Sequence, residues 1–332
     1  MKLTNQLTNI ARLFSLTLLG GALGVLAPAL RAQDQTATPK SGTEEKAFSS
    51  PDEAVNALKA ASQAGDQSAL QEIFGPQYHE LLTGDKVQDA NNASHFAAAL
   101  ADHCEQVKQG DDTITLEIGT NDWPYPIPLV KTDNQWHFDT AAGKEEIISR
   151  HIGKDELNAI GVCRAYVTAQ LKYASMNPDT SGGTKYALKF KSTTGTKDGL
   201  YWPAADNEPA SPFGALVAQA QIEGYHHHRV GPQSFHGYYF TILTRQGDAA
   251  PGGKMDYETN GNLTGGFALL AYPEHWDQSG VMTFMIDQDG KLYQRNLGPK
   301  TSRLAAKIKE YNPNDQWTLV QDQGVLDAVT EK

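Results

Sequence analysis

The chain has 332 residues, with 28 Lys and Arg against 39 Asp and Glu, and a formal net charge of −11 at pH 7. This length is enough for about two domains and for a sizeable hydrophobic core. The acidic balance and the lack of any Lys/Arg run argue against nucleic-acid binding and against a patch that binds anionic membranes.

The first 32 residues have the pattern of a Sec-type signal peptide. Lys2 and Arg12 form a basic start, the stretch Leu13–Leu30 is apolar, and small residues around 27–32 offer a cleavage site. The alternative is an uncleaved membrane anchor, but Pro28 and its small neighbours favour cleavage. We therefore predict a periplasmic or secreted protein with no transmembrane segment in the mature chain. Cleavage removes three bases and no acids, which leaves 25 bases, 39 acids and a charge of −14.

The predicted fold class is α+β, with two domains that each combine helices with an antiparallel sheet. Residues 33–47 are polar and aperiodic, as in a disordered tether. The N-terminal domain is predicted over residues 48–143. Ser50 is a good N-cap and Glu53 completes a capping box, so a helix begins here and ends at Gly65. Further helices are expected over 67–74, 78–82 and 92–109, and strands over 113–118, 125–131 and 135–139.

The C-terminal domain is predicted over residues 144–321, with the boundary near 143–153 and a loose tail over 322–332. Its strongest signal is the stretch 237–298, which has the pattern of consecutive antiparallel strands. Asp-Gly at 289–290 favours a hairpin between the last two. The expected elements are helices over 144–151, 155–174, 212–220 and 301–310, and strands over 185–190, 238–244, 267–272, 281–286 and 291–296.

The two cysteines, Cys104 and Cys163, leave two interpretations open. An even count in an exported protein permits one disulfide. The two positions are 59 apart, and a bond between them would stabilise the chain by roughly 3–5 kcal/mol in the chain-entropy model. The alternative is a pair of unbonded thiols.

His226 and His228, at the ends of a three-histidine run, form a candidate metal site, because neutral imidazole is a common ligand of Zn, Ni and Cu. Adjacent residues on a strand point to opposite faces, however, and no Cys or suitably spaced acid joins them. The competing interpretation is a solvated loop. We therefore expect no cofactor.

A second candidate site is a ligand rim formed by glycine-rich connections between strands. It would comprise residues 248–253 and 260–266 with His236, Tyr238, Tyr257 and Trp276. The competing interpretation is tight turns that need positive φ angles. The nucleophile elbow, the phosphate-binding loop and a complete zinc-peptidase motif are absent, and acids at 139, 145, 146, 155 and 156 are expected to be solvated charges at a helix start.

Two local resemblances accompany these patterns. SSPDEAVNALKAASQAGDQSALQEIFG and the strand NQWHFD resemble the cone-shaped α+β fold of the ketosteroid-isomerase and nuclear-transport-factor class. AIGVCRAYVTAQLKYA, with Gln170 and Tyr173, resembles the second half of a type IV pilin helix. The following strands resemble the pilin-type terminal sheet, whose hairpin pattern is matched by Gly280, Phe284, Asp287 and Gly290. The polar RHIGKDELN replaces the apolar half-helix of a pilin, so only the globular half is implied.

Taken end to end, the mature chain resembles an exported bacterial family known only as domain of unknown function 2950. The resembling pieces are FSSPDEAVNAL, RHIGKDELNAI, AQLKYA, FHGYYFTILTRQGDAAPGG, GGFALLAYPEHWDQSGVMTF and NPNDQW. The resemblance implies no activity. We expect a non-enzymatic envelope protein that binds a small ligand or another envelope protein, or serves as an assembly scaffold. The alternative is a periplasmic hydrolase or other enzyme that uses a pocket in the N-terminal cone or a metal at His226–His228.

Overall fold

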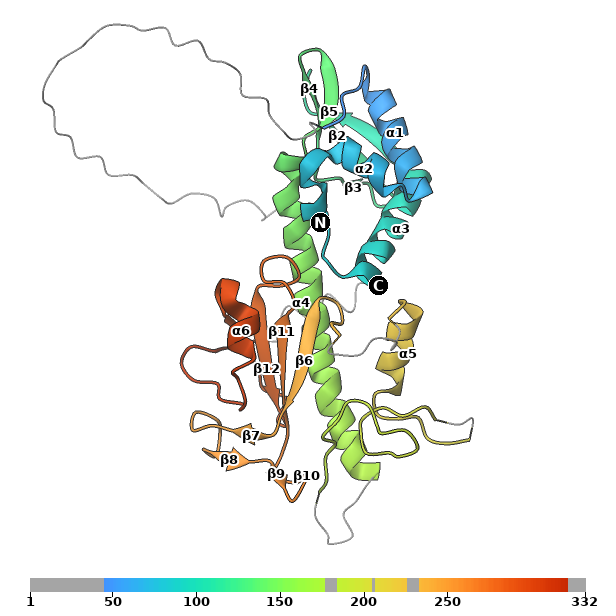
Figure 1. Cartoon of the computed structure of the whole chain (residues 1–332). Helices are drawn as coiled ribbons and strands as arrows, with labels where there is room; N and C mark the ends of the chain where they lie inside the picture. The colour runs from blue at the N-terminus through green and yellow to red at the C-terminus, as the bar shows by residue number, and fades with distance from the viewer. Residues whose placement is uncertain (1–44, 177–183, 205–206, 226–232, 322–332) are drawn as a thin grey trace, which may run out of the picture. The chain divides into compact units, whose positions relative to one another are not determined.

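The structure, a computed structural model, describes residues 45–176, 184–204, 207–225 and 233–321 (Figure 1). All of them belong to the same unit, Gly42–Lys332. The predicted signal peptide, most of the tether, the metal candidates His226 and His228, and the C-terminal tail lie outside the described residues. The fold is α+β, as the sequence predicts.

The N-terminal part packs helices against an antiparallel sheet. The sheet has the strand order β1-β2-β4-β5, and the short β3 pairs with β2. The elements are α1 (Pro51–Ala64), α2 (Gln67–Phe74), the 3-10 helix η1 (Gly75–Leu81), α3 (Lys86–Asp102), β1 (Cys104–Lys108), β2 (Thr113–Ile118), β3 (Trp123–Pro124), β4 (Leu129–Thr132) and β5 (Gln135–Phe138).

Helix α1 begins and ends as the sequence predicts. The Ser50 hydroxyl accepts a hydrogen bond from the Glu53 amide at 3.2 Å, which satisfies one of the free donors of the first turn. The Glu53 carboxylate accepts from the Ser49 amide at 2.9 Å, so the reciprocal bond of the capping box is shifted by one residue. Gly65 ends the helix with φ of +63°.

The predicted helix over 92–109 is wrong at both ends. Asp85 caps α3 by accepting from the Val87 amide at 2.9 Å, so the helix begins six residues earlier, at Lys86. It stops at Asp102, and Cys104–Lys108 is strand β1. The physical reason is that β1 pairs with β2 along its whole length, from Cys104–Ile118 to Lys108–Ile114. The hydrogen-bonded pairing of β1 with β2 therefore outweighs the helix-like spacing of the apolar residues in this segment.

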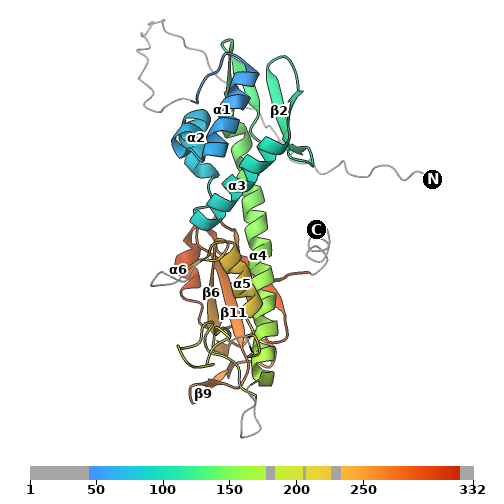
Figure 2. The ribbon, with the colours of Figure 1, turned by 90° about the vertical axis from the view of Figure 1, so that its right-hand side faces the viewer.

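Helix α4 (Thr140–Met176) is a single helix of 37 residues (Figures 1 and 2). The predicted break near Gly153 is wrong. A glycine costs a helix interior only about 1 kcal/mol relative to alanine, and α4 packs on η1 before this point and on the C-terminal sheet after it. The expected domain boundary, near 143–153, lies inside this helix. Among the described residues, no helix combines the length and the apolar character that a bilayer crossing requires.

The C-terminal part is built on a five-stranded antiparallel sheet with the order β14-β13-β12-β11-β6. Asp287 forms the predicted hairpin turn, because its Oδ1 accepts from the amides of Asp289 and Lys291 at 3.1 and 3.0 Å. The elements are α5 (Gly214–Ile222), β6 (Tyr238–Leu243), β7 (Arg245–Gln246), β8 (Met255–Asp256), β9 (Glu258–Thr259), β10 (Asn262–Leu263), β11 (Ala268–Pro273), β12 (Met282–Asp287), β13 (Leu292–Asn296), η2 (Gly298–Lys300), α6 (Thr301–Ala305) and β14 (Thr318–Leu319).

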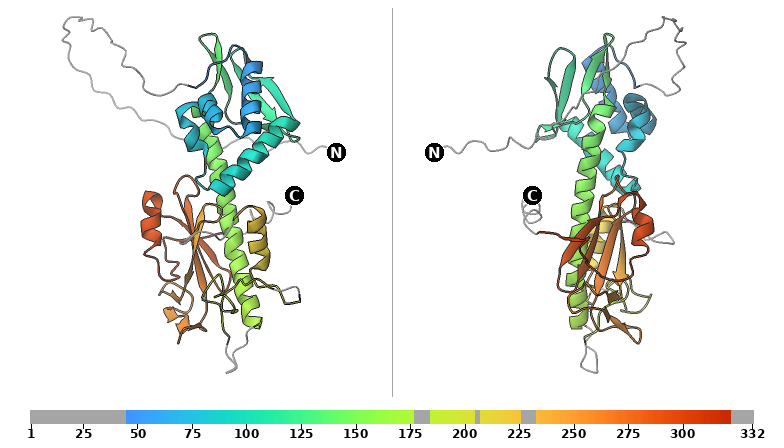
Figure 3. Two further views of the ribbon diagram at one scale, coloured as in Figure 1. Left: turned by 45° about the vertical axis from the view of Figure 1, so that its right-hand side comes forward. Right: turned by 90° about the vertical axis from the view of Figure 1, so that its left-hand side faces the viewer.

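Both faces of the central strand β11 are covered. Residues 268–271 of β11 are at most 1% exposed, so neither face of the strand meets solvent. Figures 1 and 3 show α4 on one side of the sheet and α6 on the other. Glu156 fixes the helix to the sheet, because its Oε1 accepts from the amides of Val281 and Met282, each at 2.9 Å. The core therefore lies between α4 and the sheet.

Two shorter predictions in this part are wrong. Residues 185–190 form only an isolated bridge, between Tyr186 and Leu263, because Gln170 of α4 takes both backbone groups of Ala187 at 2.8 Å. The last helix ends at Ala305, not near 310. The chain beyond it runs beside β7, where the Tyr311 amide donates to the Arg245 carbonyl at 2.9 Å.

Candidate ligand-binding pocket

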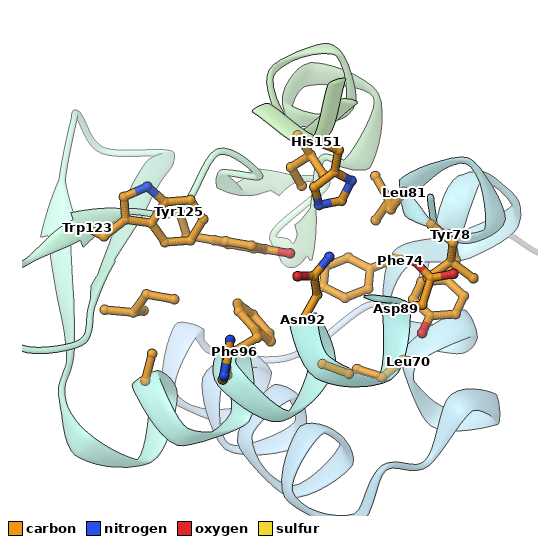
Figure 4. A pocket seen from close by; sticks show the side chains of 16 residues that line it. Leu70, Phe74, Tyr78, Leu81, Asp89, Asn92, Phe96, Trp123, Tyr125 and His151 are labelled. Carbon is orange, nitrogen blue, oxygen red and sulfur yellow. The ribbon is translucent and has the colours of Figure 1, made fainter. Parts of the chain in front are cut away.

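A pocket of about 410 Å³ lies in the N-terminal part, bounded by α2, η1, α3, the β2–β3 region and the first half of α4 (Figure 4). Small-molecule sites in proteins have volumes of roughly 300–1,000 Å³, so this one is large enough for a drug-sized molecule. Its lining is mostly aliphatic and aromatic. The polar exceptions are Asp89, Asn92, His95 and His151.

Aromatic rings form one wall around Tyr125. Its ring centroid lies 5.1 Å from that of Phe96, 6.1 Å from that of Trp123 and 6.4 Å from that of Phe74. Trp123 is 37% exposed, so it borders the solvent side, and the Arg150 guanidinium lies 4.9 Å from its ring centroid. Edge and tilted ring contacts of this kind favour a fixed wall.

The Tyr125 hydroxyl is the buried polar group of this wall. The residue is 6% exposed, and its hydroxyl makes no hydrogen bond to any of the described residues. In Figure 4 the hydroxyl points into the pocket. Burial raises the pKa of Tyr125 far above its usual value. The group is therefore a neutral hydroxyl that can both donate and accept.

His151 of α4 and Asn92 of α3 approach the same space from other elements (Figure 4). Neither side chain has a hydrogen-bond partner in the part of the chain that the structure describes. Burial lowers the pKa of His151, and the opposing influence of Asp89 is smaller. A neutral imidazole offers one donor and one acceptor. His95, the remaining polar lining residue, is exposed to solvent. Tyr125, Asn92 and His151 are therefore the three buried or partly buried uncommitted groups that face the apolar pocket.

Two other polar lining groups are already used by the fold. The Asp89 Oδ1 accepts from the Thr83 amide and hydroxyl, each at 2.8 Å. The Tyr78 hydroxyl donates to Gln67 Oε1 at 2.7 Å. Within the described ranges, no group of three His, Cys, Asp or Glu side chains is placed to hold a metal ion. The mostly apolar lining and its uncommitted hydroxyl, amide and imidazole suit the pocket to hydrogen bonding and apolar contact.

The predicted rim residues lie in different surroundings, and none of them lines this pocket. Tyr238 and Tyr257 are fully buried in the C-terminal core. Their hydroxyls donate to the Met282 carbonyl at 2.8 Å and to Gln246 Oε1 at 2.7 Å. Trp276 donates from Nε1 to Asn296 at 3.0 Å.

His236, the fourth rim residue, belongs to a set of buried and partly buried polar side chains that contact one another. We call this set the Asp155 cluster, and its members are Asp85, Gln88, Asp155, Glu223, Tyr225 and His236. His236 has φ of +47°, and its Nε2 lies 2.9 Å from Glu223 Oε2. The Tyr225 hydroxyl donates to Asp85 Oδ2 at 2.8 Å and accepts from the His236 amide at 3.3 Å. These contacts join α3, the end of α5 and the chain just before β6.

Asp155 is the most buried member, with no exposed surface. Its Oδ1 accepts from Gln88 Nε2 at 2.6 Å, whereas its Oδ2 has no hydrogen-bond partner among the described residues. Burial raises the pKa of Asp155 to about 7. The prediction that Asp155 is a solvated charge at a helix start is wrong, because α4 begins at Thr140 and carries Asp155 into the interior.

The two cysteines are unbonded in the structure. Cys104 on β1 is partly buried against the N-terminal core, and Cys163 on α4 is fully buried in the C-terminal core. Burial raises the pKa of both thiols, that of Cys163 to about 12. A disulfide between the two residues stays a prediction.

A pocket in the N-terminal part entered the sequence interpretation only with the alternative enzyme hypothesis, and none of its polar groups was identified. Asn92, Tyr125 and His151 are far apart in sequence and belong to no motif. The sequence signal is weak. Tyr125 stands in a Pro-interrupted segment predicted as a strand, and His151 stands in RHIGKDELN, which is notable only for its polarity and its part in the family resemblance.

A protein-family comparison covers most of the chain. The model of family DUF2950, described as proteins of unknown function, matches residues 45–320. This range includes the pocket and the Asp155 cluster. No curated protein and no solved structure matches the sequence or the fold.

Proposed function

Because this chain belongs to the DUF2950 family, whose function is unknown, we propose a function from the pocket itself: non-enzymatic binding of a small, uncharged, mostly apolar molecule with one hydrogen-bonding end. The observation that carries the proposal is the set of three uncommitted polar groups, Asn92, Tyr125 and His151, in a pocket of about 410 Å³ with aromatic walls.

The lining favours an uncharged ligand. Tyr125 is protonated and His151 is neutral for the reasons given above, and Asp89 is engaged by Thr83. An anionic ligand would lose its hydration without meeting a cation in the lining, which is costly. The one lining carboxylate, Asp89, already accepts two hydrogen bonds from Thr83 at Oδ1. An apolar body gains roughly 25 cal/mol for each Å² that it buries. The hydroxyl, imidazole and amide then fix the orientation of its polar end.

We further propose that the protein is exported to the bacterial envelope, where the ligand or another envelope protein is its partner. The basic and apolar pattern of residues 1–32 supports this. The finer fold proposal is the pilin-like one, supported by the packing of α4 on the antiparallel sheet through Tyr166, whose hydroxyl donates to the Ala268 carbonyl of β11. N-terminal sequencing of protein from a periplasmic fraction tests the export. An intact Met1 would contradict it.

A second candidate function is acid–base catalysis in the same pocket. The observation that favours it is the neutral His151 imidazole, which can accept a proton, in the same cavity as the Tyr125 hydroxyl. This function predicts that a bound molecule changes mass over time, and that His151→Gln stops the change without abolishing binding. An unchanged mass spectrum of the recovered ligand contradicts it.

The binding proposal can be tested with the mature chain and a neutral fluorescent probe, N-phenyl-1-naphthylamine. Ala93 and Ala98 are both exposed on α3, but only Ala93 lines the pocket. Ala93→Trp places an indole in the pocket and should weaken probe binding at least about tenfold, which corresponds to 1.4 kcal/mol. Ala98→Trp is the matched control and should leave the affinity unchanged.

Mass spectrometry of molecules released from the purified protein then identifies the natural ligand class. An uncharged, largely apolar molecule that is lost from the Ala93→Trp variant supports the proposal. Equal probe binding by wild type and the two variants would overturn it, because the probe would then bind elsewhere.

A further inference from the structure

A second pocket, of about 420 Å³, lies on the C-terminal sheet and has a different lining from the first. It is bounded by β7, β12, β13 and the segment that follows α6. Four of its lining residues are cationic, and Glu310 is the one lining acid. The four cations are Arg245, Arg295, Lys307 and Lys309. We call this site the cationic pocket.

The described residues offer the four cations no salt-bridge partner. Across the described ranges, no carboxylate lies within 4.0 Å of their nitrogen atoms, and none of them forms a side-chain hydrogen bond. Arg295 is the most telling of them, because it is partly buried on β13, opposite Thr283. A partly buried guanidinium loses hydration and is normally compensated by an anion.

The neutral polar residues of the cationic pocket also present donors. The amide oxygen of Asn312 accepts from the Ala249 amide at 2.8 Å, and that of Asn314 accepts from the Gln316 amide at 3.1 Å. These bonds occupy the oxygens, so each side-chain NH₂ group is left as a donor. Trp317, which is 8% exposed, and Met285 close the apolar base.

This concentration of positive charge contrasts with the chain as a whole, whose formal charge is −11. Four like charges around one cavity repel one another, and a bound anion relieves that repulsion while it gains charge-assisted hydrogen bonds. Arginine forks match the oxygens of phosphate and carboxylate groups, and a single chloride would leave most of the donors unused.

We propose that the cationic pocket binds a polyvalent anion whose phosphate or carboxylate groups are held by Arg245 and Arg295, with Lys307 and Lys309 contributing charge. The site is separate from the apolar pocket and does not depend on the function proposed for it. Such an anion occurs either as a free soluble molecule or as the headgroup of an anionic lipid, and the experiment separates these sources.

The experiment measures pyrophosphate binding to the mature chain by calorimetry at low ionic strength. The test variant combines Arg245→Gln with Arg295→Gln. The control combines Lys300→Gln with Arg303→Gln, two exposed cations outside the pocket, so the net charge changes equally. We expect the pocket variant to bind at least about tenfold more weakly, because two charge-assisted contacts are lost, and the control to bind as wild type does.

A second arm replaces pyrophosphate with phosphatidylglycerol vesicles in a flotation assay. Vesicle binding that requires the arginine pair, without pyrophosphate binding, supports the proposal and identifies a lipid headgroup as the anion. Pyrophosphate binding that requires the pair identifies a soluble ligand. No binding in either arm overturns the proposal, as does an equal loss in the control. Thermal unfolding of both variants verifies that they are folded.

Discussion

His151 and Asp155 stand four residues apart on α4, so they share one side of the helix, yet they belong to opposite kinds of site. His151 faces a pocket in which its own side chain and those of Asn92 and Tyr125 have no hydrogen-bond partner among the described residues. Asp155 lies in a cluster whose members bind one another, from the Gln88 amide to the Tyr225 hydroxyl. Asp155 Oδ2 also has no hydrogen-bond partner among the described residues, but Asp155 has no exposed surface. The comparison teaches that an unpartnered polar group indicates a ligand site only where a pocket reaches it, as one reaches His151.

The two sites also differ in what they cost the fold. A polar group that faces an accessible pocket keeps water or a ligand as its partner, so its free-energy cost is small. A carboxyl group without solvent contact is instead driven toward its neutral form. The pKa of about 7 for Asp155 expresses that cost. Substitutions in the Asp155 cluster should therefore change stability, whereas those in the pocket should change binding.

The largest expected effect comes from Gly237→Ala, which tests how tightly the Asp155 cluster is packed. Gly237 has φ of +68°, and an added Cβ would lie 2.6 Å from the Cβ of Ser279 and 2.9 Å from Asp155 Oδ2. Left-handed strain costs about 1–2 kcal/mol, and overpacking adds about 1–3 kcal/mol. We expect a loss of about 3 kcal/mol in the free energy of unfolding, measured by urea denaturation.

Gly65→Ala is the matched control for this prediction. Gly65 has nearly the same φ, +63°, but an added Cβ would meet no atom within 4 Å. Its substitution should cost only the strain, about 1 kcal/mol. Equal losses for the two variants would show that the surroundings of Asp155 are not tightly packed.

The next effect in size is the pH dependence of Asp155→Asn. The folded-state pKa of about 7 lies above the ordinary carboxyl value of 3.8, so the native state holds this proton more tightly than the unfolded state does. Wild-type stability from this group is therefore present at low pH and is lost as the pH rises towards 7. Asparagine mimics the protonated form. The free energy of unfolding of the Asp155→Asn variant, relative to that of wild type, should therefore rise by about 2 kcal/mol between about pH 5 and about pH 8.

Asp198→Asn provides the contrasting control. Hydrogen bonds from Lys189 and from two threonines hold the pKa of Asp198 below its usual range, so it is ionised in both states above about pH 5. Its substitution should therefore have the same effect on stability at both pH values. A pH-independent difference for Asp155→Asn as well would mean that Asp155 is already ionised in the native state.

The sequence predicts the C-terminal sheet better than any other part of the fold. Its runs of β-branched and aromatic residues predict strands, and Asp-Gly at 289–290 predicts a hairpin. These local preferences agree with the strand pairing in the structure. The helix over 92–109 fails because β1 exists only through its ladder with β2, which is a long-range interaction. The break at Gly153 fails for a related reason, since packing along α4 offsets the local preference of glycine.

The polar groups of the candidate site are beyond sequence reasoning for a geometric reason. Asn92, Tyr125 and His151 come from α3, the chain after β3, and α4, and no fixed spacing relates them. What makes them notable is the absence of a protein partner within the described chain, which depends on every neighbouring side chain. Asp155 is hidden in the same way, because a charged residue in a polar stretch gives no sign of burial.

The smallest expected effect, and the sharpest test of the comparison, is Tyr125→Phe. Because the Tyr125 hydroxyl makes no hydrogen bond to the described residues, its removal should change the free energy of unfolding by less than about 0.5 kcal/mol. Tyr238→Phe is the control. It removes a buried donor to the Met282 carbonyl and should cost about 1 kcal/mol or more.

Probe binding should respond in the opposite order, weakened by Tyr125→Phe and unchanged by Tyr238→Phe. If Tyr125→Phe destabilised the protein as much as Tyr238→Phe, the hydroxyl would be part of the fold and not a group held ready for a ligand.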